Sequence, residues 1–300
     1  MRLQVACRYL APSDARSKGG GVWLVGATHL GERRYYDDLQ RLLDAQPLVL
    51  FEGVGATNKQ FQIRNASDFS LQESLAHALG LEFQLNAIDY SKPHFHNSDL
   101  SLAQLTKLFQ PPEPKPQAAG DGTHAEPASA PGANAGQGFA QLVQVMEGSG
   151  ILGAVARFGV GIIAASPRLQ ATTKVGLMEM LDQLSGDFQR WPGMPKDFQD
   201  LLKVLIEERN KTVVHDVSNA LRASPAPSAI AVFYGAGHMP DLEVRLCTQL
   251  GYRTAKEQWL TAFEVNPLTS GLSAVELDFM RRWIRMELNV LQQTNTSAEK

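Results

Sequence analysis

The feature that most constrains the fold is a pattern that occurs near each end of the chain: a short apolar run followed directly by a Gly-x-x-His turn. Gly21–Val25 leads into Gly26–His29, and Ala229–Tyr234 leads into Gly235–His238. Apolar runs of this length indicate buried strands. Each histidine would therefore stand where a strand ends and a helix begins, which is the edge of an open α/β sheet where active sites form. The two histidines can then meet although most of the chain separates them.

Helical periodicity follows the first turn. Apolar side chains recur at helical spacing from about Glu32 to Ala45, and an all-apolar strand at Leu48–Phe51 ends in Glu52. Strands that are joined through a helix run parallel, with a right-handed crossover. We therefore expect His29 and Glu52 at the same carboxyl edge of two neighbouring strands.

A further helix and strand are predicted after this unit. Leu71–Leu79 has helical spacing, and Phe83–Ile88 is predicted to be a strand that ends in Asp89. Asp89 would then add a third polar group to the edge formed by the first two strands. The KPHFH motif that follows has two histidines at metal-like spacing, but its proline favours an exposed loop.

The second half of the chain returns to helix and strand. The helix predicted at about Pro195–Leu221 carries Arg209 in the middle of its apolar stripe. A core-facing arginine needs a carboxylate or a bound anion, because burying it unpaired is costly. A structural pair with Asp216 and a side chain that reaches the surface are the alternatives. A helix at about Asp241–Leu250 and a strand at Trp259–Phe263 follow the second turn.

The chain closes with an amphipathic helix. Ser273 and Glu276 form a capping box at its start. Its apolar face is expected to cover the sheet, with a contact to another copy of the chain as the alternative. The residues of this face are Val275, Phe279, Trp283, Ile284, Leu288 and Leu291.

These elements predict an α/β fold: a mixed, largely parallel sheet flanked by helices, in one domain over residues 1–300. Residues 111–138 are rich in Pro, Gly, Ala, Gln and Ser and are expected to be a disordered linker or surface insertion. Residues 139–184 are expected to be a helical insertion. Its most apolar part, Ile151–Ala165, is shorter than a bilayer span and contains Arg157. A buried helical hairpin is therefore expected there, with a lid or a membrane-surface contact as alternatives.

Composition narrows the class of protein. The chain has 300 residues, 44% of them hydrophobic, which is enough for a large core. A net charge of −3 and the lack of a basic stripe argue against a nucleic-acid partner. Cys7 and Cys247 are too few for a disulfide framework, and the N-terminus has no apolar segment of a secretory signal, so a cytoplasmic protein is expected. No nucleophile elbow, P-loop or dinucleotide fingerprint is present.

His29, Glu52 and His238 form a candidate metal site. Two imidazoles and one carboxylate with open positions suit a catalytic divalent cation such as Mn²⁺, Co²⁺ or Zn²⁺. Such a cation lowers the pKa of its bound water, which suits hydrolysis of a peptide or another amide or ester bond. In a metal-free alternative, one histidine is the general base, oriented by Glu52. In a third, the histidines bind haem or the protein sequesters a peptide without catalysis.

Candidate substrate-binding residues surround this centre. Gly26 and Gly235 would permit a tight turn, and Gly237 would let the backbone approach a ligand closely. Arg209 would bind a substrate carboxylate or stabilise a developing oxyanion. Asp89 completes this set.

Four segments in order, VGATHLG, LVLFEG, EERN and FYGAGHMP, resemble the TraB/PrgY/GumN family, which includes the TIKI proteases. The resemblance spans about Gly21–Asp89 and Pro195–Phe263. It implies an α/β fold related to erythromycin-esterase and ChaN-like proteins, and, for the TIKI branch, a metal-dependent peptidase. The chain departs from the family at Asp241, where glycine is usual. By motif, the implied site residues are His29, Glu52, Arg209, Asn210 and His238.

Overall fold

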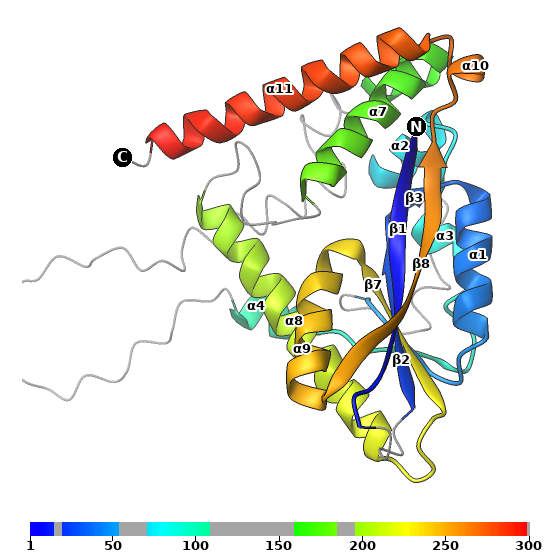
Figure 1. The fold of residues 1–300 in the computed structure, drawn as a ribbon, viewed down its shortest axis with the longest axis vertical. Coiled ribbons are helices and arrows are strands. Elements are labelled where there is room, and N and C mark those ends of the chain that lie inside the picture. The colour runs from blue at the N-terminus through cyan, green and yellow to red at the C-terminus, as the bar shows by residue number, and fades with distance from the viewer. Residues whose placement is uncertain (15–19, 54–70, 109–158, 185–195, 299–300) are drawn as a thin grey trace, which may run out of the picture.

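The computed structural model describes residues 1–14, 20–53, 71–108, 159–184 and 196–298. These residues form one main sheet with helices on both of its faces (Figure 1). The predicted α/β class, with a mixed and largely parallel sheet, is confirmed.

The main sheet has six strands in the order β6-β4-β7-β2-β1-β8. The four strands β6, β4, β7 and β2 run parallel, whereas β1 is antiparallel to both β2 and β8. A separate antiparallel pair joins β3 to β5. The strands are β1 (Arg2–Pro12), β2 (Gly21–Ala27), β3 (Leu30–Gly31), β4 (Val49–Phe51), β5 (Glu82–Phe83), β6 (Phe95–Asn97), β7 (Ala229–Gly235) and β8 (Tyr252–Glu264).

Helices cover the two faces of this sheet, with α1 on one side and α8 and α9 on the other (Figure 1). The helices are α1 (Arg33–Asp44), α2 (Leu71–Ala78), α3 (Gln84–Ala87), α4 (Leu102–Leu108), α7 (Pro167–Leu184), α8 (Lys196–Arg222), the 3₁₀ turn η2 (Ala236–His238), α9 (Met239–Leu250), α10 (Pro267–Ser270) and α11 (Ala274–Ala298). None of the helices in the described ranges is long and apolar enough to cross a membrane.

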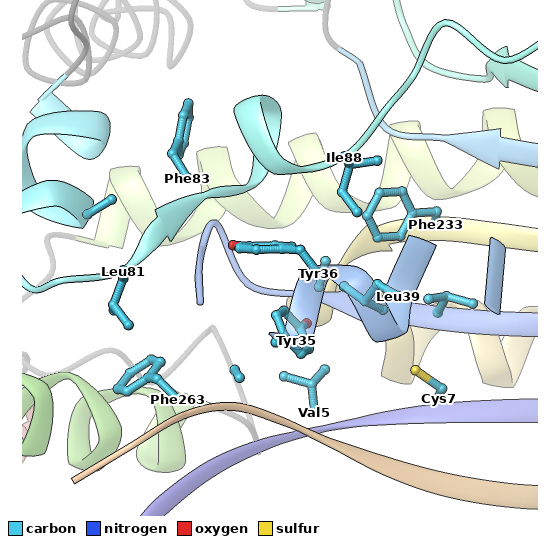
Figure 2. Packing of buried hydrophobic residues seen from close by; sticks show 14 of the residues in the cluster. Val5, Cys7, Tyr35, Tyr36, Leu39, Leu81, Phe83, Ile88, Phe233 and Phe263 are labelled. Carbon is cyan, nitrogen blue, oxygen red and sulfur yellow. The ribbon is translucent and has the colours of Figure 1, made fainter. Parts of the chain in front are cut away.

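The central strands are apolar along their whole length because both of their faces are buried. In β7, Phe233 packs into the core beneath α1, whereas Val232 and Tyr234 pack into the core beneath α8 and α9. This alternation follows from the two-residue period of a strand. On the α1 side, Tyr35 and Leu39 lie together with residues of β1 such as Cys7 (Figure 2).

The sheet order corrects the prediction that the first two parallel strands are neighbours. β7 lies between β2 and β4, with Ala27 opposite Gly235 and Phe51 opposite Phe233. A strand from late in the chain therefore separates the strand that leads to His29 from the strand that leads to Glu52. Local periodicity in the sequence carries no information about such a long-range insertion.

The strand predicted at Phe83–Ile88 is wrong. β5 ends at Phe83 and the next four residues form α3. Among the described strands, β5 pairs with the two-residue β3 alone, so a longer strand would find no partner there for its backbone groups. The chain instead turns, and the Gln84 N–H donates to the carbonyl oxygen of His29 at 2.9 Å.

The loop predicted for the KPHFH motif is also wrong. Phe95–Asn97 forms β6, which pairs in parallel with β4. The Phe95 side chain is fully buried, which favours the sheet. Pro93 precedes the strand, where its missing N–H removes no hydrogen bond of the sheet.

β1 and β8 form a long antiparallel pair. The sequence analysis does not predict β1, and it predicts only part of β8. The predicted strand Trp259–Phe263 is the last part of β8. In β1 the two-residue period is weak, because Ala6 and Leu10 interrupt the polar face of Arg2, Gln4 and Arg8. Arg8 contacts Glu257 at 2.6 Å and Glu243 at 3.0 Å, while Cys7 on the opposite face is buried.

The helical insertion predicted at 139–184 is described only in its last part, where α7 is helical as expected. The linker predicted at 111–138, and most of the apolar stretch Ile151–Ala165, lie outside the described residues.

The predicted capping box of the C-terminal helix is confirmed. The Ser273 N–H donates to Glu276 Oε2 at 2.7 Å, and the Glu276 N–H donates to Ser273 Oγ at 3.2 Å. The prediction that this helix covers the sheet with its apolar face is wrong. α11 lies along α7 instead (Figure 1), and Val275, Phe279 and Trp283 are exposed.

Candidate functional site

The carboxyl ends of the parallel strands bring the candidate residues to one edge of the sheet. β2 leads into Thr28 and His29, β4 into Glu52, and β7 into the η2 turn that carries His238. β7 is the middle strand of the three, so His238 lies between the other two positions along the edge. The predicted convergence of these chain segments on one edge therefore has its geometric basis in the position of β7.

Glu52 is anchored by its neighbours at both carboxylate oxygens. Arg209 Nη2 lies 2.6 Å from Oε1, and the backbone N–H of Gly235 donates to Oε2 at 2.6 Å. The Glu52 N–H also donates to the carbonyl oxygen of Phe233 at 3.0 Å, which continues the β4–β7 ladder by one residue. The carboxylate thus has a single orientation, set by a strand and a helix that are distant in sequence.

Glu52 is ionised at all but strongly acidic pH. Burial by itself would raise the pKa of this carboxyl group. The nearby His238 and Arg209, the Gly235 N–H and finally His29 outweigh burial and lower the pKa from 4.5 to about 2. This charged carboxylate is 21% exposed, and it can bind a cation or accept a hydrogen bond.

Arg209 pairs with two carboxylates, Glu52 and Asp99. Its Nε donates to Asp99 Oδ1 at 2.9 Å and its Nη2 to Asp99 Oδ2 at 2.6 Å. The Asp99 side chain is fully buried and also accepts the backbone N–H of Gly53 at 3.0 Å. Burial would lower the pKa of Arg209, but the hydrogen bonds and charges of Asp99 and Glu52 raise it above its ordinary value. The guanidinium is therefore a fixed positive charge of the site.

This pairing decides between the alternatives for Arg209. Asp216 does not pair with it and instead accepts the hydroxyl of Ser98 at 2.6 Å. The arginine does reach carboxylates, as its place on the apolar stripe of α8 requires.

A hydrogen-bond chain sets the tautomer of His238. Both hydrogens of the Asn210 side-chain amide are donated: to Asp241 Oδ2 at 2.8 Å and to the His238 carbonyl oxygen at 3.4 Å. The Asn210 Oδ1 therefore faces His238 Nδ1, 2.7 Å away, and can only accept. His238 must donate from Nδ1, which assigns the lone pair of its neutral ring to Nε2.

That lone pair faces Glu52. His238 Nε2 lies 3.8 Å from Glu52 Oε1. Burial lowers the pKa of His238 below 6.5; the charge of Glu52 opposes this effect and that of Arg209 adds to it. The ring is thus neutral at neutral pH. Two electron-pair donors from neighbouring strands face each other, which is a pairing that a metal ion or a water molecule can bridge.

His29 lies on the same edge but its side chain is exposed. A positive charge on His29 helps to lower the pKa of Glu52, so the two side chains interact electrostatically. Its backbone is fixed, because its carbonyl oxygen accepts the Gln84 N–H. Among the residues that the structure describes, no three His, Cys, Asp or Glu side chains come close enough together to hold a metal ion.

The predicted glycines do not act through a special turn conformation, because none of Gly26, Gly235 and Gly237 has a positive φ. Gly26 is a residue of β2 rather than of a turn, and a Cβ there would lie 3.0–3.3 Å from Val5, Ala6 and Met239. At Gly235 a Cβ would lie 3.2 Å from Glu52 Oε2. Close packing, rather than turn geometry, explains these two glycines.

Asp89 does not join the other residues. It follows α3 rather than a strand, and its carboxylate accepts the backbone N–H of Ser91 at 3.0 Å. It therefore organises a loop, which is the common role of such an aspartate.

The structure adds two acids that sequence reasoning missed. Asp99 follows β6 at the same sheet edge, and it was missed because the segment before it was assigned to a loop. The sequence marks Asp241 only as the start of a predicted helix and as a departure from a family pattern. Its place three residues after His238, in the first turn of α9, lets it reach Asn210.

A cleft of about 890 Å³ opens beside this site, between β1 and the helices α7, α8 and α11. Thr28, Ala236 and Gly237, from the two Gly-x-x-His turns, contribute to its wall, whereas Glu52, Arg209 and His238 do not. The cleft is therefore a neighbour of the polar centre and not the centre itself.

Comparison of this chain with protein-family models, with curated proteins and with solved structures finds no match.

Proposed function

We propose that the protein is a metal-dependent hydrolase of peptides or of other amide or ester substrates, with His238, Glu52 and His29 at its centre. The observation that carries the proposal is the pair formed by His238 Nε2 and Glu52 Oε1, 3.8 Å apart at one sheet edge. His238 offers a lone pair and Glu52 a charge, which are the donors that Mn²⁺, Co²⁺ and Zn²⁺ accept.

The support around these donors fits a metal site. A ligating histidine usually donates its other ring N–H to an oriented acceptor, and Asn210 fills that role for His238. Asp241 holds Asn210 in turn, and Arg245 Nε contacts Asp241 Oδ2 at 2.5 Å. Two of the three proposed ligands are thus already oriented. An exposed imidazole such as His29 can change rotamer at little cost and supply the third.

Each residue has a part in the proposed reaction. A bound divalent cation would supply an acidified water molecule and polarise a carbonyl group. His238 and Glu52 hold their donor atoms in place, and Arg209 keeps Glu52 charged and oriented. If a substrate carbonyl group bound next to Glu52, the guanidinium would also stabilise the oxyanion that develops there.

The first experiment measures metal binding by the full chain with Mn²⁺, Co²⁺ or Zn²⁺ alone. Wild type is expected to bind one ion, and the d–d spectrum of the Co²⁺ form is expected to report nitrogen and oxygen ligands. His238→Ala and Glu52→Gln should abolish binding, and His29→Ala should weaken it. His215→Ala is the matched control, because His215 is an exposed residue of α8. A wild-type protein that binds none of these ions at saturating supply would overturn the metal-dependent proposal.

Asp241→Ala tests the orienting chain separately. Without the carboxylate, the Asn210 amide can flip and His238 can adopt either tautomer. Metal affinity is expected to fall about 10- to 100-fold, as is usual when a partner of a ligating histidine is lost. Nitrogen NMR shifts of the imidazole should show a mixture of tautomers. Unchanged affinity together with an unchanged tautomer would contradict this role.

Hydrolysis of fluorogenic peptides and p-nitrophenyl esters separates the proposal from its alternatives. Activity that is lost on chelation and restored by one of the metals supports the proposal. Activity that survives chelation but not His238→Ala would favour the metal-free general base. A Soret shift on haem titration, without hydrolysis, would favour a haem-binding protein.

With only two cysteines and no disulfide framework, we propose the cytoplasm as its compartment.

A further inference from the structure

α11 carries an apolar stripe on the side that faces away from the rest of the molecule. Its residues are 49–79% exposed, although they are large hydrophobic side chains. Exposed contiguous apolar surface of this kind marks an interaction site. The stripe consists of Val275, Phe279, Trp283, Met286 and Val290.

α11 uses its opposite side to pack on the body of the protein. Leu277, Met280 and Ile284 pack into the core cluster that contains Met178 of α7. On the same side, Arg281 contacts the buried carboxylate of Glu179 at 2.6 Å. Figure 1 shows α11 as the outermost helix, with α7 between it and the rest of the fold. The stripe lies on the side of α11 opposite these contacts, and its large apolar side chains are exposed.

The spacing of the stripe is that of a coiled coil. Phe279, Trp283, Met286 and Val290 are separated by four, three and four residues. This places them at successive d, a, d and a positions of a heptad repeat, the seam along which two helices pack. An ordinary surface helix has no need of that spacing on its outer side.

We propose that α11 pairs with α11 of a second copy of this chain, in parallel and in register. The charges beside the stripe select this partner and this direction. With the seam as above, Arg282 occupies a g position and Glu287 the e position five residues later. In a parallel pair, g of one helix meets e of the other at this offset, so two Arg282–Glu287 contacts form. In an antiparallel pair, g faces g and e faces e, and these opposite charges do not meet.

Charge exchange tests the proposal on the full chain. Wild type is expected to be a dimer by sedimentation velocity and light scattering. Arg282→Glu and Glu287→Arg should each raise the dissociation constant at least about tenfold, because each places like charges together twice. Arg282→Gln is the matched control. It removes the contact between Arg282 and Asp278 of the same helix without adding a repulsive charge.

The decisive measurement mixes the two single variants. In a heterodimer, the glutamate introduced at position 282 faces the arginine introduced at position 287, and the other two positions keep their natural pair. An equimolar mixture should therefore associate about as tightly as wild type. If the two charges acted only within one chain, mixing the variants would not restore association. A mixture that stays as weak as its components would overturn the parallel pairing.

Two further outcomes are decisive. A wild-type chain that remains monomeric at the highest soluble concentration would overturn the proposal and indicate that another segment of the same chain covers the stripe. In a Cys247→Ser background, Phe279→Cys and Val290→Cys should each form disulfide-linked dimers, because a parallel register places both ends of the seam beside their own copies. Failure of both to cross-link in a dimeric protein would overturn the register.

Discussion

Arg209 is the residue on which the local order of the site depends most. Arg209 lies on α8 and bonds to two carboxylates. One is that of Glu52, which follows β4, and the other is that of Asp99, which follows β6. Each carboxylate also accepts a backbone N–H, from Gly53 or Gly235, so the network fixes four backbone segments together. A buried network of this kind is costly to break, because the remaining charges stay in a site of low dielectric.

We expect Arg209→Met to lower the free energy of unfolding by about 3–5 kcal/mol, because two carboxylates lose their common partner. Urea unfolding at neutral pH measures this. Arg33→Met is the control, since its pair with Asp37 is at the surface, and it should change stability by less than about 1 kcal/mol. Equal effects of the two substitutions would contradict the role assigned to Arg209.

The lowered pKa of Glu52 predicts how stability depends on pH. The folded value is about 2 and the ordinary value is 4.5, so the unfolded chain takes up the proton first as the pH falls. The contribution of this group, about 3 kcal/mol, is therefore complete above pH 4.5 and is lost as the pH falls towards about 2. The measurement is the difference in unfolding free energy between wild type and Glu52→Gln at a series of pH values. The difference should shrink through this window, and a constant difference would refute the assignment.

At the scale of elements, α7 attaches α11 through one buried acid. The Glu179 side chain is 1% exposed, and it contacts both Arg281 and Arg285 of α11. Apolar contacts flank these ion pairs. Because α11 packs mainly on α7, its attachment depends on this single helix.

Glu179→Ala is expected to loosen α11 without unfolding the sheet. Amide hydrogen exchange in 274–286 should become faster by about tenfold or more, since hydrogen bonds to charged groups contribute about 1.5–3 kcal/mol each. Exchange in β7 should be unchanged. The control is Asp182→Ala, which removes an exposed partner of Arg285 and should have a much smaller effect. Equal acceleration in α11 and β7 would show that the two parts open together.

At the scale of the whole molecule, the sheet divides the interior into two cores. One contains Cys7 beneath α1, and the other lies beneath α8 and α9. Cys7 is fully buried, and burial raises the pKa of its thiol to about 12. Cys247 is partly exposed on α9, and its pKa is also raised by burial, though less strongly.

The two thiols should therefore react at very different rates. Iodoacetamide at neutral pH is expected to label Cys247 first, while Cys7 reacts only when the whole fold opens, because the thiolate is the reactive form. In Cys247→Ser, labelling of Cys7 followed by mass spectrometry should match the global opening measured by hydrogen exchange in β7. Fast labelling of Cys7 in the native protein would contradict the closed core.

Local patterns in the chain determined the two strand–turn units, the helices at 33–44 and 196–222, and the capping box of α11. They also determined that Glu52 and His238 follow parallel strands, because buried strands and amphipathic helices have periods that are visible in a few residues. The sequence also indicated Arg209, because it is a charged residue on the apolar stripe of a helix. Burial at such a position requires a carboxylate or a bound anion beside the guanidinium.

The identity of that partner was decided by the tertiary structure alone. The insertion of β7 between β2 and β4 brings His238 to Glu52, and the pairing of β6 with β4 brings Asp99 to Arg209. The exposure of the apolar face of α11 could not be predicted from the sequence either. An apolar stripe looks the same in the sequence whether it packs on a sheet or faces solvent. These features depend on contacts between residues that are distant in the sequence, from 46 positions for β4 and β6 to more than 180 for Glu52 and His238, and such contacts leave no periodicity.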